Sequence, residues 1–561
     1  MKIFLAQQNY HIGNFEANTA KIISAIEKAK EQGGDLIVFS ELSVCGYPPR
    51  DFLEFNDFIE QGLASIDKIK EAADTIGVLV GCPSRNPKIE GKDLFNSAYL
   101  LYEKKIKGIV HKSLLPNYDI FDEYRYFEPA YEWNILHFKG KKLAVTICED
   151  IWNLGDDPQY RICPMDELVK QKPDIMINLS ASPFDYIHEE GRKSIVKRNV
   201  LKYNLPMVYC NTIGSQTEII FDGGSLVMNA NGDLVTEMPY FAESMASVTW
   251  NEDGFFSPSQ PPPRGGGVIS IEVHGEKYEP NKNIEKIHHA IVLGIRDYFS
   301  KMGFKKAIVA SSGGIDSAVV LALACEALGA KNVNALLLPS QFSTGHSVID
   351  AELLSRNLGT HYDIIPIKGI FETFEASLKP VFKDLPFNVA EENLQSRIRG
   401  AMVMALSNKF GSILLNTSNK SELATGYGTL YGDMAGGLGV IGDLYKMQVY
   451  ALARYINRDK EIIPVNIIDK APSAELRPDQ KDSDSLPEYN ILDPILYQYI
   501  ERRHGPKEII NMGHDAALVS RILKLVNTNE YKRNQFCPII RVSPKAFGIG
   551  RRVPIVGKYL S

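Results

Sequence analysis

Three reactive side chains in the first half of the chain stand directly after apolar runs that predict strands. Glu41 follows residues 36–40, Lys112 follows residues 109–111 and Cys148 follows residues 143–147. Loops just past strand ends are where a scaffold commonly presents catalytic groups. The three would supply a carboxylate base, a cation for an oxyanion and a thiol nucleophile. Each taken alone is as well explained by burial or solvation, so the chemistry depends on their converging in the fold.

A serine- and glycine-rich loop marks the second half. Residues 310–317 read ASSGGIDS, between a short apolar run at 307–310 and a helix-forming run at 318–328. A loop that opens a helix can turn several backbone N–H groups toward an anion, which the helix dipole also favours. Asp316 beside a phosphate indicates a cation between them. A plain strand-to-helix turn is the alternative, but Gly-Gly with three serines is more than such a turn needs.

The composition excludes several classes of protein. The 561 residues are 44% hydrophobic and 23% charged, with a net charge of −6, so no basic surface for nucleic acid or membranes stands out. The seven cysteines contain no CxxC pair, which argues against zinc ribbons and disulfide frameworks. We find no apolar run long enough to span a membrane and no signal peptide, and we expect a cytoplasmic protein.

The elements that must position these residues fall into two parts. We place a linker at residues 251–283, because 251–267 read NEDGFFSPSQPPPRGGG, and this divides the chain into domains at 1–250 and 284–561. The first part predicts an α/β sandwich with much antiparallel pairing. The second predicts a parallel, doubly wound α/β sheet with ligands at the carboxyl ends of its strands. Its predicted strands are 308–310, 333–339, 362–367 and 412–416.

The sequence segments around Glu41, Lys112 and Cys148 resemble the nitrilase, or carbon–nitrogen hydrolase, superfamily. The segments are FSELSVCGYPPRD around Glu41, HKSLLPNYDIFDEYRYF around Lys112 and ICEDIW around Cys148. The resemblance covers about residues 1–250 and the order Glu, Lys, Cys matches the catalytic triad of that family. It implies an α-β-β-α sandwich that hydrolyses an amide.

The same resemblance implies the residues that hold the amide substrate. Glu123 matches a second structural carboxylate, and Tyr118 and Ser182 match substrate contacts. The family pattern SPxxxG[KR] is longer here, with Gly191-Arg192 as the best match, so the basic contact is open between Arg192 and Lys193.

The second half resembles two nested families. SGGIDS resembles the pyrophosphate loop of ATP pyrophosphatases (PP-loop enzymes), which split ATP into AMP and pyrophosphate. An ordered set of further segments resembles NAD⁺ synthetases, and with the nitrilase half it resembles their glutamine-dependent form: EENLQSRIRG (391–400), NTSNKSELATGYGTLYGDMAGG (416–437), GDLYKMQVYALARY (442–455), KAPSAELRPDQKDSDSLPEYNILDPIL (470–496) and EYKRNQFCP (530–538).

This resemblance implies ATP-dependent amidation of deamido-NAD⁺, the last step of NAD⁺ biosynthesis, through an adenylated carboxylate. Ammonia from glutamine is the nucleophile, an internal ammonia channel is expected, and the products are NAD⁺, AMP, pyrophosphate and glutamate. The chain is expected to form homo-oligomers. The implied ATP contacts are Ala310, Ser311, Ser312, Gly313, Gly314, Ile315, Asp316, Ser317 and Thr417. The implied deamido-NAD⁺ contacts are Asn393, Arg397, Glu422, Asp433, Lys446 and Lys532. Mg²⁺ would bridge Asp316, Glu422 and phosphate oxygens.

Two other functions remain open from the residues. The second half would suit another PP-loop enzyme, such as a GMP synthase-like or tRNA-modifying one, although CxxC pairs and a basic surface are missing. A catalytically inactive scaffold would not need intact Glu41, Lys112, Cys148 and SGGIDS. The GxGxxG pattern at 437–442 lacks a convincing preceding strand, and we interpret it as a mobile glycine-rich loop rather than a dinucleotide fingerprint.

Overall fold

The computed structural model describes residues 1–155, 158–251, 254–256, 277–473, 475–478 and 480–560. The chain forms two compact units, Met1–Glu272 and Val273–Ser561, which we describe separately. Most of the expected linker, residues 252–253 and 257–276, lies outside the described residues. Gly254–Phe256, also within that stretch, forms a strand that pairs with the last long strand of the first unit.

The first unit alternates strands and helices early and then becomes rich in strands. Its strands are β1 (Lys2–Gln7), β2 (Leu36–Val38), β3 (Gly77–Arg85), β4 (Leu94–Tyr102), β5 (Lys105–His111), β6 (Leu136–Phe138), β7 (Lys141–Ile147), β8 (Ile175–Ser180), β9 (Met207–Asn211), β10 (Ile213–Gln216), β11 (Ile219–Asp222), β12 (Leu226–Met228), β13 (Leu234–Glu237), β14 (Ser244–Asn251) and β15 (Gly254–Phe256). Its α-helices are α1 (Phe15–Glu31), α2 (Asn56–Ala72), α3 (Pro164–Leu168) and α4 (His188–Tyr203), and its 3-10 helices are η1 (Arg50–Glu54), η2 (Glu123–Arg125), η3 (Cys148–Ile151) and η4 (Val169–Gln171).

Two large mixed sheets face each other in this unit. Among the described residues, one sheet has the strand order β15-β14-β1-β2-β3-β4-β5 and the other β13-β12-β9-β8-β7-β6. Each has a parallel centre, β1-β2-β3 or β7-β8-β9, flanked by antiparallel pairs. One apolar core lies between the sheets and takes side chains such as Leu5, Leu79, Val145 and Ile177 from both.

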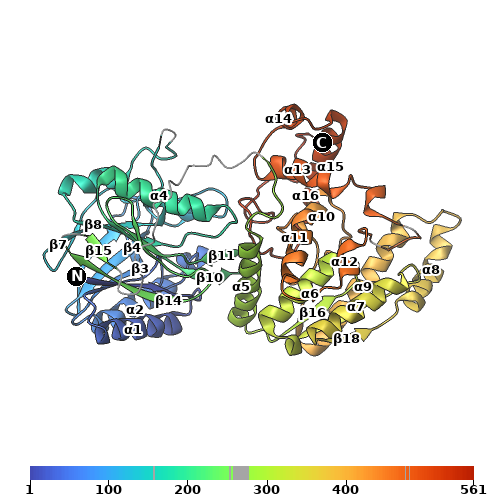
Figure 1. Ribbon diagram of the computed structural model, residues 1–561, viewed down its shortest axis with the longest axis horizontal. Helices are drawn as coiled ribbons and strands as arrows, with labels where there is room; N and C mark the ends of the chain where they lie inside the picture. The colour runs from blue at the N-terminus through green and yellow to red at the C-terminus, as the bar shows by residue number, and fades with distance from the viewer. Residues whose placement is uncertain (156–157, 252–253, 257–276, 474, 479, 561) are drawn as a thin grey trace. The chain divides into compact units, whose positions relative to one another are not determined.

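Helices cover the two outer faces, which gives the expected α-β-β-α sandwich. Helices α1 and α2 lie on one side and α4 on the other (Figure 1). Ile195 and Val200 of α4 pack with Met176 and Tyr209 on the outer face of the second sheet. The central strands are therefore buried on both faces, which explains why β1 and β8 are mostly apolar in sequence instead of alternating with polar residues.

The second unit is a βα alternation followed by a helical region. Its strands are β16 (Lys306–Ala310), β17 (Val333–Leu337), β18 (His361–Ile364), β19 (Ser412–Asn416) and β20 (Leu438–Gly439). Its helices are α5 (Ile284–Met302), α6 (Ile315–Leu328), α7 (Gly345–Leu358), α8 (Lys368–Phe382), α9 (Val389–Phe410), α10 (Lys420–Thr425), α11 (Lys446–Ile456), α12 (Val465–Asp469), α13 (Tyr489–Ile500), α14 (Pro506–Asn511), α15 (Ala516–Thr528) and α16 (Glu530–Arg533), with 3-10 turns η5 (Ala330–Asn332) and η6 (Asp482–Asp484).

The described strands of this unit form one parallel sheet in the order β18-β17-β16-β19-β20. One face packs against α8 and α9, where Phe371, Ile398 and Val403 join Ile308 and Leu336 of the sheet. Helices α5, α6 and α11 pack on one another and α6 contacts β16 and β17. The doubly wound parallel sheet predicted from the sequence is confirmed.

The glycine-rich segment at 437–442 differs from its prediction. Leu438–Gly439 forms β20, which extends the sheet beside β19, and Leu438 to Gly442 are buried. A Cβ on Gly439 or Gly442 would come within 3.4 Å of Ile539 atoms. These glycines therefore allow close packing against the C-terminal segment, and part of the expected loop is a buried strand at the end of the sheet.

Candidate active sites

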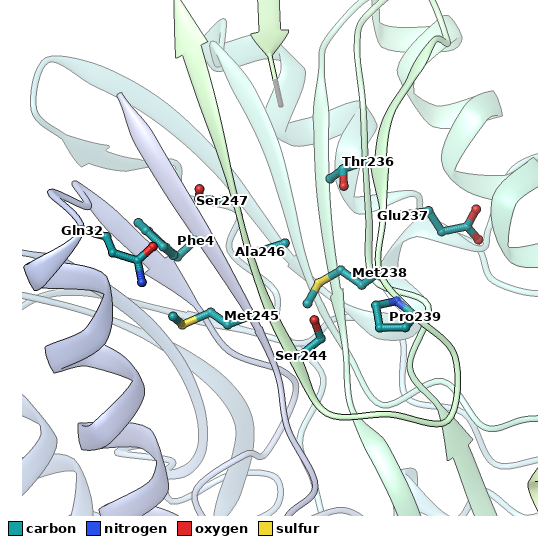
Figure 2. Close-up of a pocket in the computed structure, with 10 residues that line it drawn as sticks. All are labelled: Phe4, Gln32, Thr236, Glu237, Met238, Pro239, Ser244, Met245, Ala246 and Ser247. Carbon is teal, nitrogen blue, oxygen red and sulfur yellow. The ribbon is translucent and has the colours of Figure 1, made fainter. Parts of the chain in front are cut away.

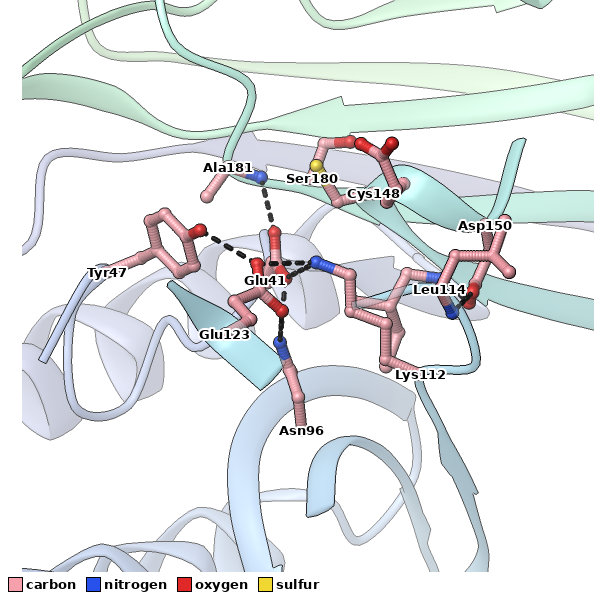
Figure 3. A network of polar contacts seen from close by, with 12 residues as sticks. Glu41, Tyr47, Asn96, Lys112, Leu114, Glu123, Cys148, Asp150, Ser180 and Ala181 are labelled. Atoms are coloured by element: carbon pink, nitrogen blue, oxygen red, sulfur yellow. Dashed lines mark hydrogen bonds and ion pairs between the residues drawn. The ribbon is translucent and has the colours of Figure 1, made fainter. Parts of the chain in front are cut away.

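The three strand-end residues of the first unit converge. Glu41 follows β2, Lys112 follows β5 and Cys148 follows β7, and Lys112 Nζ lies 2.8 Å from Glu41 Oε1. Cys148 lies near this pair (Figure 3), close enough for the charges of Glu41 and Lys112 to act on its thiol. All three side chains are buried. The fold therefore brings the predicted nucleophile, base and cation to one point at the carboxyl ends of strands from both sheets.

Lys112 is held between two carboxylates. Its Nζ lies 2.7 Å from Oε1 of Glu123 in η2, which also accepts a hydrogen bond of 2.8 Å from the Tyr47 hydroxyl. Burial alone would lower the pKa of Lys112, but Glu123 and Glu41 outweigh it and raise that pKa well above its ordinary value. Burial raises the pKa of Glu123 to about 7, against the opposing effect of Lys112. The two carboxylates thus favour the charged form of Lys112.

Three donors orient the Glu41 carboxylate. Lys112 Nζ and Asn96 Nδ2 donate to Oε1, at 2.8 and 2.7 Å, and the backbone N–H of Ala181 donates to Oε2 at 3.0 Å. A carboxylate offers about four acceptor sites, so one remains for a proton from a substrate or nucleophile. Asn96 and Ala181 were not anticipated from the sequence, because they reach Glu41 from distant strands.

Cys148 sits at a strained turn between β7 and η3. Its φ of 42° lies in the left-handed region, which costs a non-glycine residue roughly 1–2 kcal/mol. Burial and the nearby Glu41 raise the pKa of the Cys148 thiol well above its ordinary value, while Lys112 opposes them. These effects favour the protonated thiol, which would need a base if Cys148 is to act as a nucleophile.

Asp150 joins the turn of the nucleophile to the loop of the lysine. Its Oδ1 accepts from the backbone N–H groups of Ser113 and Leu114, both at 2.9 Å, and its Oδ2 accepts from Ile147 N at 3.0 Å. Burial raises the pKa of Asp150 to about 6, and the three N–H bonds and Lys112 oppose this. The sequence analysis missed this residue, although it lies within the quoted ICEDIW segment.

The residues expected to hold the amide substrate have clear contacts. The Tyr118 hydroxyl donates to Glu149 at 3.0 Å, and Ser182 N donates to Asn211 Oδ1 at 2.9 Å. Arg192 lies on α4 rather than in a loop. It is buried, with its terminal nitrogens bonded to both carboxylate oxygens of Asp222 and to the Gly223 carbonyl.

The alternative basic residue, Lys193, pairs with Glu237 at 2.8 Å near the protein surface. Both basic candidates thus already have acidic partners, and the choice between them for a substrate contact stays a prediction. Helix α4 was not predicted, because its sequence is rich in charged residues and has no clear apolar face.

In the second unit, the serine-glycine loop joins the end of β16 to the start of α6, as predicted. Gly313 has a φ of 78°, and a Cβ there would come within 2.2 Å of the Ser347 carbonyl oxygen. Ser312 N and Ser317 Oγ are 3.2 Å apart, and Gly314 N donates to Ser312 Oγ. Ser311 Oγ is buried with no hydrogen-bond partner in the structure. An unpaired hydroxyl beside the N-terminus of a 14-residue helix is suited to an anion.

Two carboxylates and a lysine stand next to this loop. Lys446 Nζ lies 2.5 Å from Asp316 Oδ2 and 3.5 Å from Glu422 Oε1, and Asn419 Nδ2 donates to Asp316 Oδ1 at 2.9 Å. Asn419 and Glu422 also cap the start of α10 reciprocally. Burial and the neighbouring Asp316 raise the pKa of Glu422 to about 8, against the effect of Lys446.

A cavity of about 440 Å³ connects the loop to these groups. The predicted residues that line it are Ala310, Ser311, Ser312, Gly314, Ile315, Asp316, Ser317, Asn393, Thr417, Glu422, Asp433, Lys446 and Lys532. Gly313 and Arg397 do not line it. Arg397 is exposed on α9 and its Nε donates to the Leu430 carbonyl at 3.3 Å, whereas Arg399 lines the cavity.

Several charged residues of the cavity wall were missed by the sequence analysis. They are Glu392, Arg399, Lys470, Glu475 and Asp482. Lys470 and Glu475 pair at 2.8 Å, and Asp482 accepts from the Tyr489 hydroxyl at 2.9 Å. All but Arg399 and Glu392 come from the segment after α12, whose sequence has no periodicity that would place it over the sheet.

A second cavity, in the first unit, holds none of the predicted site residues. It measures about 350 Å³ and lies beside β13, β14 and the end of α1 (Figure 2). Its wall is formed by Phe4, Gln32, Thr236, Glu237, Met238, Pro239, Ser244, Met245, Ala246 and Ser247. Its one charged side chain, Glu237, already pairs with Lys193. We therefore assign no chemistry to it.

In the part of the chain that the structure describes, no helix is long and apolar enough to cross a membrane.

Both halves match known families. Residues 2–253 match the carbon-nitrogen hydrolase family and residues 287–536 match the NAD synthase family. A glutamine-dependent NAD(+) synthetase from Synechocystis is 43% identical over 99% of this chain and 98% of that protein. The corresponding protein from Thermotoga maritima is 40% identical over 100% of this chain and 99% of its own length.

A solved structure agrees with these matches. The glutamine-dependent NAD⁺ synthetase from Acinetobacter baumannii, in complex with ADP, superposes with a TM-score of 0.76 at 36% identity. The match covers 100% of this chain and 99% of that chain. The agreement runs through both units and across the full length, which favours this assignment over the other PP-loop enzymes and over an inactive scaffold. The chain belongs to the glutamine-dependent NAD⁺ synthetases.

Proposed function

We propose that the first unit hydrolyses glutamine at Cys148 and that the second unit uses the ammonia to convert deamido-NAD⁺ to NAD⁺ through an adenylated carboxylate. The observation that carries the first assignment is the Lys112 ammonium bonded to Glu41 beside a buried thiol. The products would be NAD⁺, AMP, pyrophosphate and glutamate. The cytoplasmic location stays a prediction from the sequence.

The geometry of the first site supports a division of labour. The Cys148 thiol attacks the amide carbon of glutamine while Glu41, with one acceptor site left, takes the thiol proton. Lys112 keeps its charge, because its pKa is raised by Glu123 and Glu41, and it stabilises the developing oxyanion. Glu123 positions Lys112. Glu41 then returns the proton to the leaving ammonia. In the second half-reaction water attacks the thioester as Glu41 takes its proton, glutamate is released, and Glu41 returns that proton to the leaving Cys148 thiolate.

The substrate contacts in this site remain proposals. Tyr118 is 43% exposed and reaches inward to Glu149, which suits a residue at the entrance. Ser182 is held by Asn211 at the end of β9. Arg192, with both terminal nitrogens bonded to Asp222, would act on glutamine through its Nε or by orienting α4.

ATP would bind at the start of α6. The backbone of residues 310–317 and the unpaired Ser311 hydroxyl form an anion site, and Thr417 lines the same cavity. The related Acinetobacter structure contains ADP, which supports a nucleotide here. The cavity volume also falls in the range of roughly 300–1,000 Å³ typical of ligand sites.

Mg²⁺ fits the donors beside this loop. The carboxylates of Asp316 and Glu422 converge on one ammonium group, that of Lys446, and Mg²⁺ commonly uses one or two carboxylates together with substrate phosphates. Within the described residues no cluster of three or more His, Cys, Asp or Glu could hold a metal by itself. Asp316 and Glu422 would hold Mg²⁺, which when bound compensates the charge of the pyrophosphate leaving group.

The dinucleotide would occupy the remaining cavity wall. Asn393, Glu422, Asp433, Lys446 and Lys532 all line it. Lys532 Nζ donates to the carbonyls of Gly426 and Gly428 at 2.7 and 2.8 Å, so it is held in place before any phosphate arrives. The exposed Arg397 contacts this side only if the substrate extends past the described cavity.

We also propose that ammonia passes between the two sites inside the protein. At neutral pH most free ammonia is protonated, and ammonium has no lone pair for attack on the adenylate. Enclosed transfer would keep it neutral and would protect the anhydride from water. An isotope competition tests this: with unlabelled glutamine as donor and ¹⁵N-ammonium in the medium, NAD⁺ should remain largely unlabelled. Extensive labelling at modest ammonium would disprove it.

An apolar surface on the second unit supports a homo-oligomer. Helices α8 and α9 pack on each other and expose several large apolar side chains, namely Ile370, Phe374, Val381, Met404 and Phe410. Large apolar side chains exposed on neighbouring helices are typical of a surface that a partner covers, and we take a second copy of this chain as that partner. Light scattering should show more than one copy per particle, and Phe374→Glu with Phe410→Glu should shift the mass to that of one chain.

Product analysis with glutamine, ATP, Mg²⁺ and deamido-NAD⁺ tests the whole assignment. Cys148→Ala should abolish NAD⁺ formation from glutamine and leave formation from ammonia intact, because only the first unit is disabled. Asp316→Asn should lower synthesis from both donors while glutamine hydrolysis persists. A Cys148→Ala protein that still releases glutamate at the original rate would refute the assignment of the nucleophile.

A further inference from the structure

A third carboxylate lies behind the charged groups that line the cavity of the second unit. Asp493, on α13, is 0% exposed. Its Oδ1 accepts a hydrogen bond of 2.6 Å from the Ser421 hydroxyl, and its Oδ2 accepts one of 2.8 Å from the backbone N–H of Met447. Asp493 is not among the described residues that line the cavity, so any effect on synthesis must pass through these two partners.

The two partners of Asp493 stand at the starts of the helices that carry Glu422 and Lys446. Ser421 lies in the first turn of α10, directly before Glu422, and Met447 directly follows Lys446 at the start of α11. The Ser421 hydroxyl also accepts from the backbone N–H of Lys446 at 3.0 Å. One buried carboxylate and one buried hydroxyl therefore join the starts of both helices.

The surroundings of Asp493 are otherwise apolar. Leu492, Ile495 and Leu496 of the same helix are buried in one hydrophobic cluster. Burial raises the pKa of Asp493 to about 7, and the Ser421 hydroxyl, the Met447 N–H and Lys446 oppose that rise. An apolar side chain would serve the packing of this core at lower cost, so the carboxylate is explained by the two donors that it holds.

The atoms that Asp493 fixes are one residue away from two side chains of the cavity. Lys446 Nζ lies 2.5 Å from Asp316 Oδ2 and 3.5 Å from Glu422 Oε1, and these two distances depend on where α10 and α11 begin. A misplacement of about 1 Å in a catalytic group commonly costs on the order of 100-fold in rate. The contact between the two helix starts is thus a point at which the fold controls the cavity.

We propose that Asp493 is a positioning residue for the synthetase reaction, which holds the starts of α10 and α11 together through Ser421 and Met447 and so sets the separation of Lys446 from Glu422. This inference rests on the proposed adenylation in the second unit. Asp493 acts from outside the cavity and touches no substrate. Ser421, at which two of the hydrogen bonds meet, shares this task.

Asp493→Asn keeps the size of the side chain, removes its charge and replaces one acceptor oxygen by a donor. We expect kcat for NAD⁺ formation from ammonia to fall roughly 10- to 100-fold, while KM for ATP changes by less than about twofold. The loop at 310–317 would still bind ATP, whereas the placement of Lys446 matters most as pyrophosphate departs. Glutamate release from glutamine should match the parent, because the first unit is unchanged.

Ser421→Ala is a second variant, which removes the hydroxyl and keeps the carboxylate. It should lower kcat in the same way but less, because the bond from Met447 to Asp493 remains. The double variant should lose less than the product of the two single losses, since both changes break the same Asp493–Ser421 bond. Losses that multiply in full would mean that the two residues act by separate routes, and the proposal would be wrong.

Asp515→Ala is the control for a general loss of stability in the helical region. Asp515 caps α15 by accepting from the backbone N–H of Leu518 at 2.8 Å. Its loss should lower the melting temperature and leave kcat at the parent value. The positioning role is refuted if Asp493→Asn keeps the parent kcat, or if Asp515→Ala loses as much kcat for an equal fall in melting temperature.

Failure of the proposed adenylation has a different signature. The parent protein would then release no AMP from ATP and deamido-NAD⁺, or Asp316→Asn would leave synthesis unchanged. If Asp493→Asn does not fold, as its circular dichroism spectrum would show, Ser421→Ala alone decides the question. A parent-like kcat in Ser421→Ala would then overturn the proposal.

Discussion

Each unit of this enzyme places one lysine between two carboxylates, but the two clusters differ in exposure. In the first unit the side chains of Lys112 and Glu41 are 0% exposed and that of Glu123 is 6% exposed. In the second unit Lys446 is 3% exposed, while Asp316 and Glu422 are 18% and 17% exposed and line a cavity of about 440 Å³. The same set of charged groups thus serves a closed site and an open one.

The two proposed reactions would account for this difference, because they draw their charge from different sources. Hydrolysis of glutamine starts from a neutral amide, so the protein must supply the base and the stabilising cation itself, and both are already in place. The proposed adenylation would start from substrates that bring many negative charges, and Asp316 and Glu422 would suit a cation that arrives with them. The closed cluster thus leaves no room for a ligand between its charged groups, whereas the open cluster lines a cavity that can take one.

Removing the lysine from each cluster should give opposite phenotypes, and this is the largest effect that we expect. Lys112→Met should lower glutamine hydrolysis by about 10³-fold, because it deletes the fixed charge at the oxyanion. NAD⁺ formation from ammonia should persist. Lys446→Met should lower synthesis from both donors while glutamate release continues. Separate assays of glutamate release and of NAD⁺ formation from glutamine and from ammonia distinguish the two variants.

The comparison would fail if Lys112→Met impaired ammonia-dependent synthesis as strongly as Lys446→Met does. The two clusters would then share a structural or catalytic task. Thermal unfolding of both variants separates this outcome from simple loss of the fold.

Gly313 sharpens the argument for the open site. Gly313→Val would place a side chain at a φ of 78° and against the Ser347 carbonyl, so the loop must move. Displacement by about 1 Å commonly costs on the order of 100-fold in rate. We expect ATP-dependent synthesis from either donor to fall by that factor, with glutamine hydrolysis intact, as measured by AMP and glutamate release.

Gly303 provides a matched control for the Gly313 variant. It ends α5 with a φ of 76°, and a Cβ there would meet nothing within 4 Å. Gly303→Ala carries the same backbone strain without a contact, so it should lower stability and leave synthesis near the parent rate. Equal losses in both variants would assign the effect to strain rather than to the loop over the cavity.

Much of the fold could be predicted from the sequence for one physical reason. Strands such as β1, β8 and β16 are covered on both faces for most of their length, so they appear as short, mostly apolar segments. Glu41 and Cys148 follow such segments. They were found because the end of a buried strand can be recognised in the sequence. The serine-glycine loop was found in the same way.

The remaining groups could not be predicted, because they depend on contacts that are distant in sequence. Asn96 reaches Glu41 across 55 positions, and Asn419 reaches Asp316 across 103. Asp150 and Glu149 were visible within a quoted segment, but nothing local distinguishes a carboxylate that holds two loops together from one at the surface. Helix α4 lacks an apolar stripe, so Arg192 was not expected on a helix.

A variant of Asp150 tests how far the fixed arrangement of the closed site extends beyond Lys112, Glu41 and Glu123. Asp150→Asn replaces one acceptor oxygen by an NH₂ group facing backbone N–H donors, so at least one of its three bonds is lost. We expect a cost of about 1.5–2 kcal/mol, a tenfold to thirtyfold fall in the rate of glutamine hydrolysis. The reactivity of Cys148 toward iodoacetamide should fall in parallel, whereas ammonia-dependent synthesis should not change. Unchanged thiol reactivity would contradict the role of Asp150 in holding the turn.

The smallest expected effect is the response of the closed site to pH. Burial raises the pKa of Glu123 to about 7, so the carboxylate that positions Lys112 becomes protonated as pH falls through 7. Protonation puts an O–H among donors from Lys112, Tyr47 and Asn96 and removes one of the two charges that fix the ammonium. Glutamine hydrolysis should therefore be about fourfold slower at pH 6.5 than at pH 8, following the ionised fraction of Glu123.

Glu123→Gln should be slower at pH 8 but should show a flat profile between pH 8 and 7, with its decline beginning nearer the pKa of about 6 at Asp150. An acid limb that stays at pH 7 in Glu123→Gln would show that a different group controls it, and the cluster would then hold Lys112 without depending on the charge of Glu123.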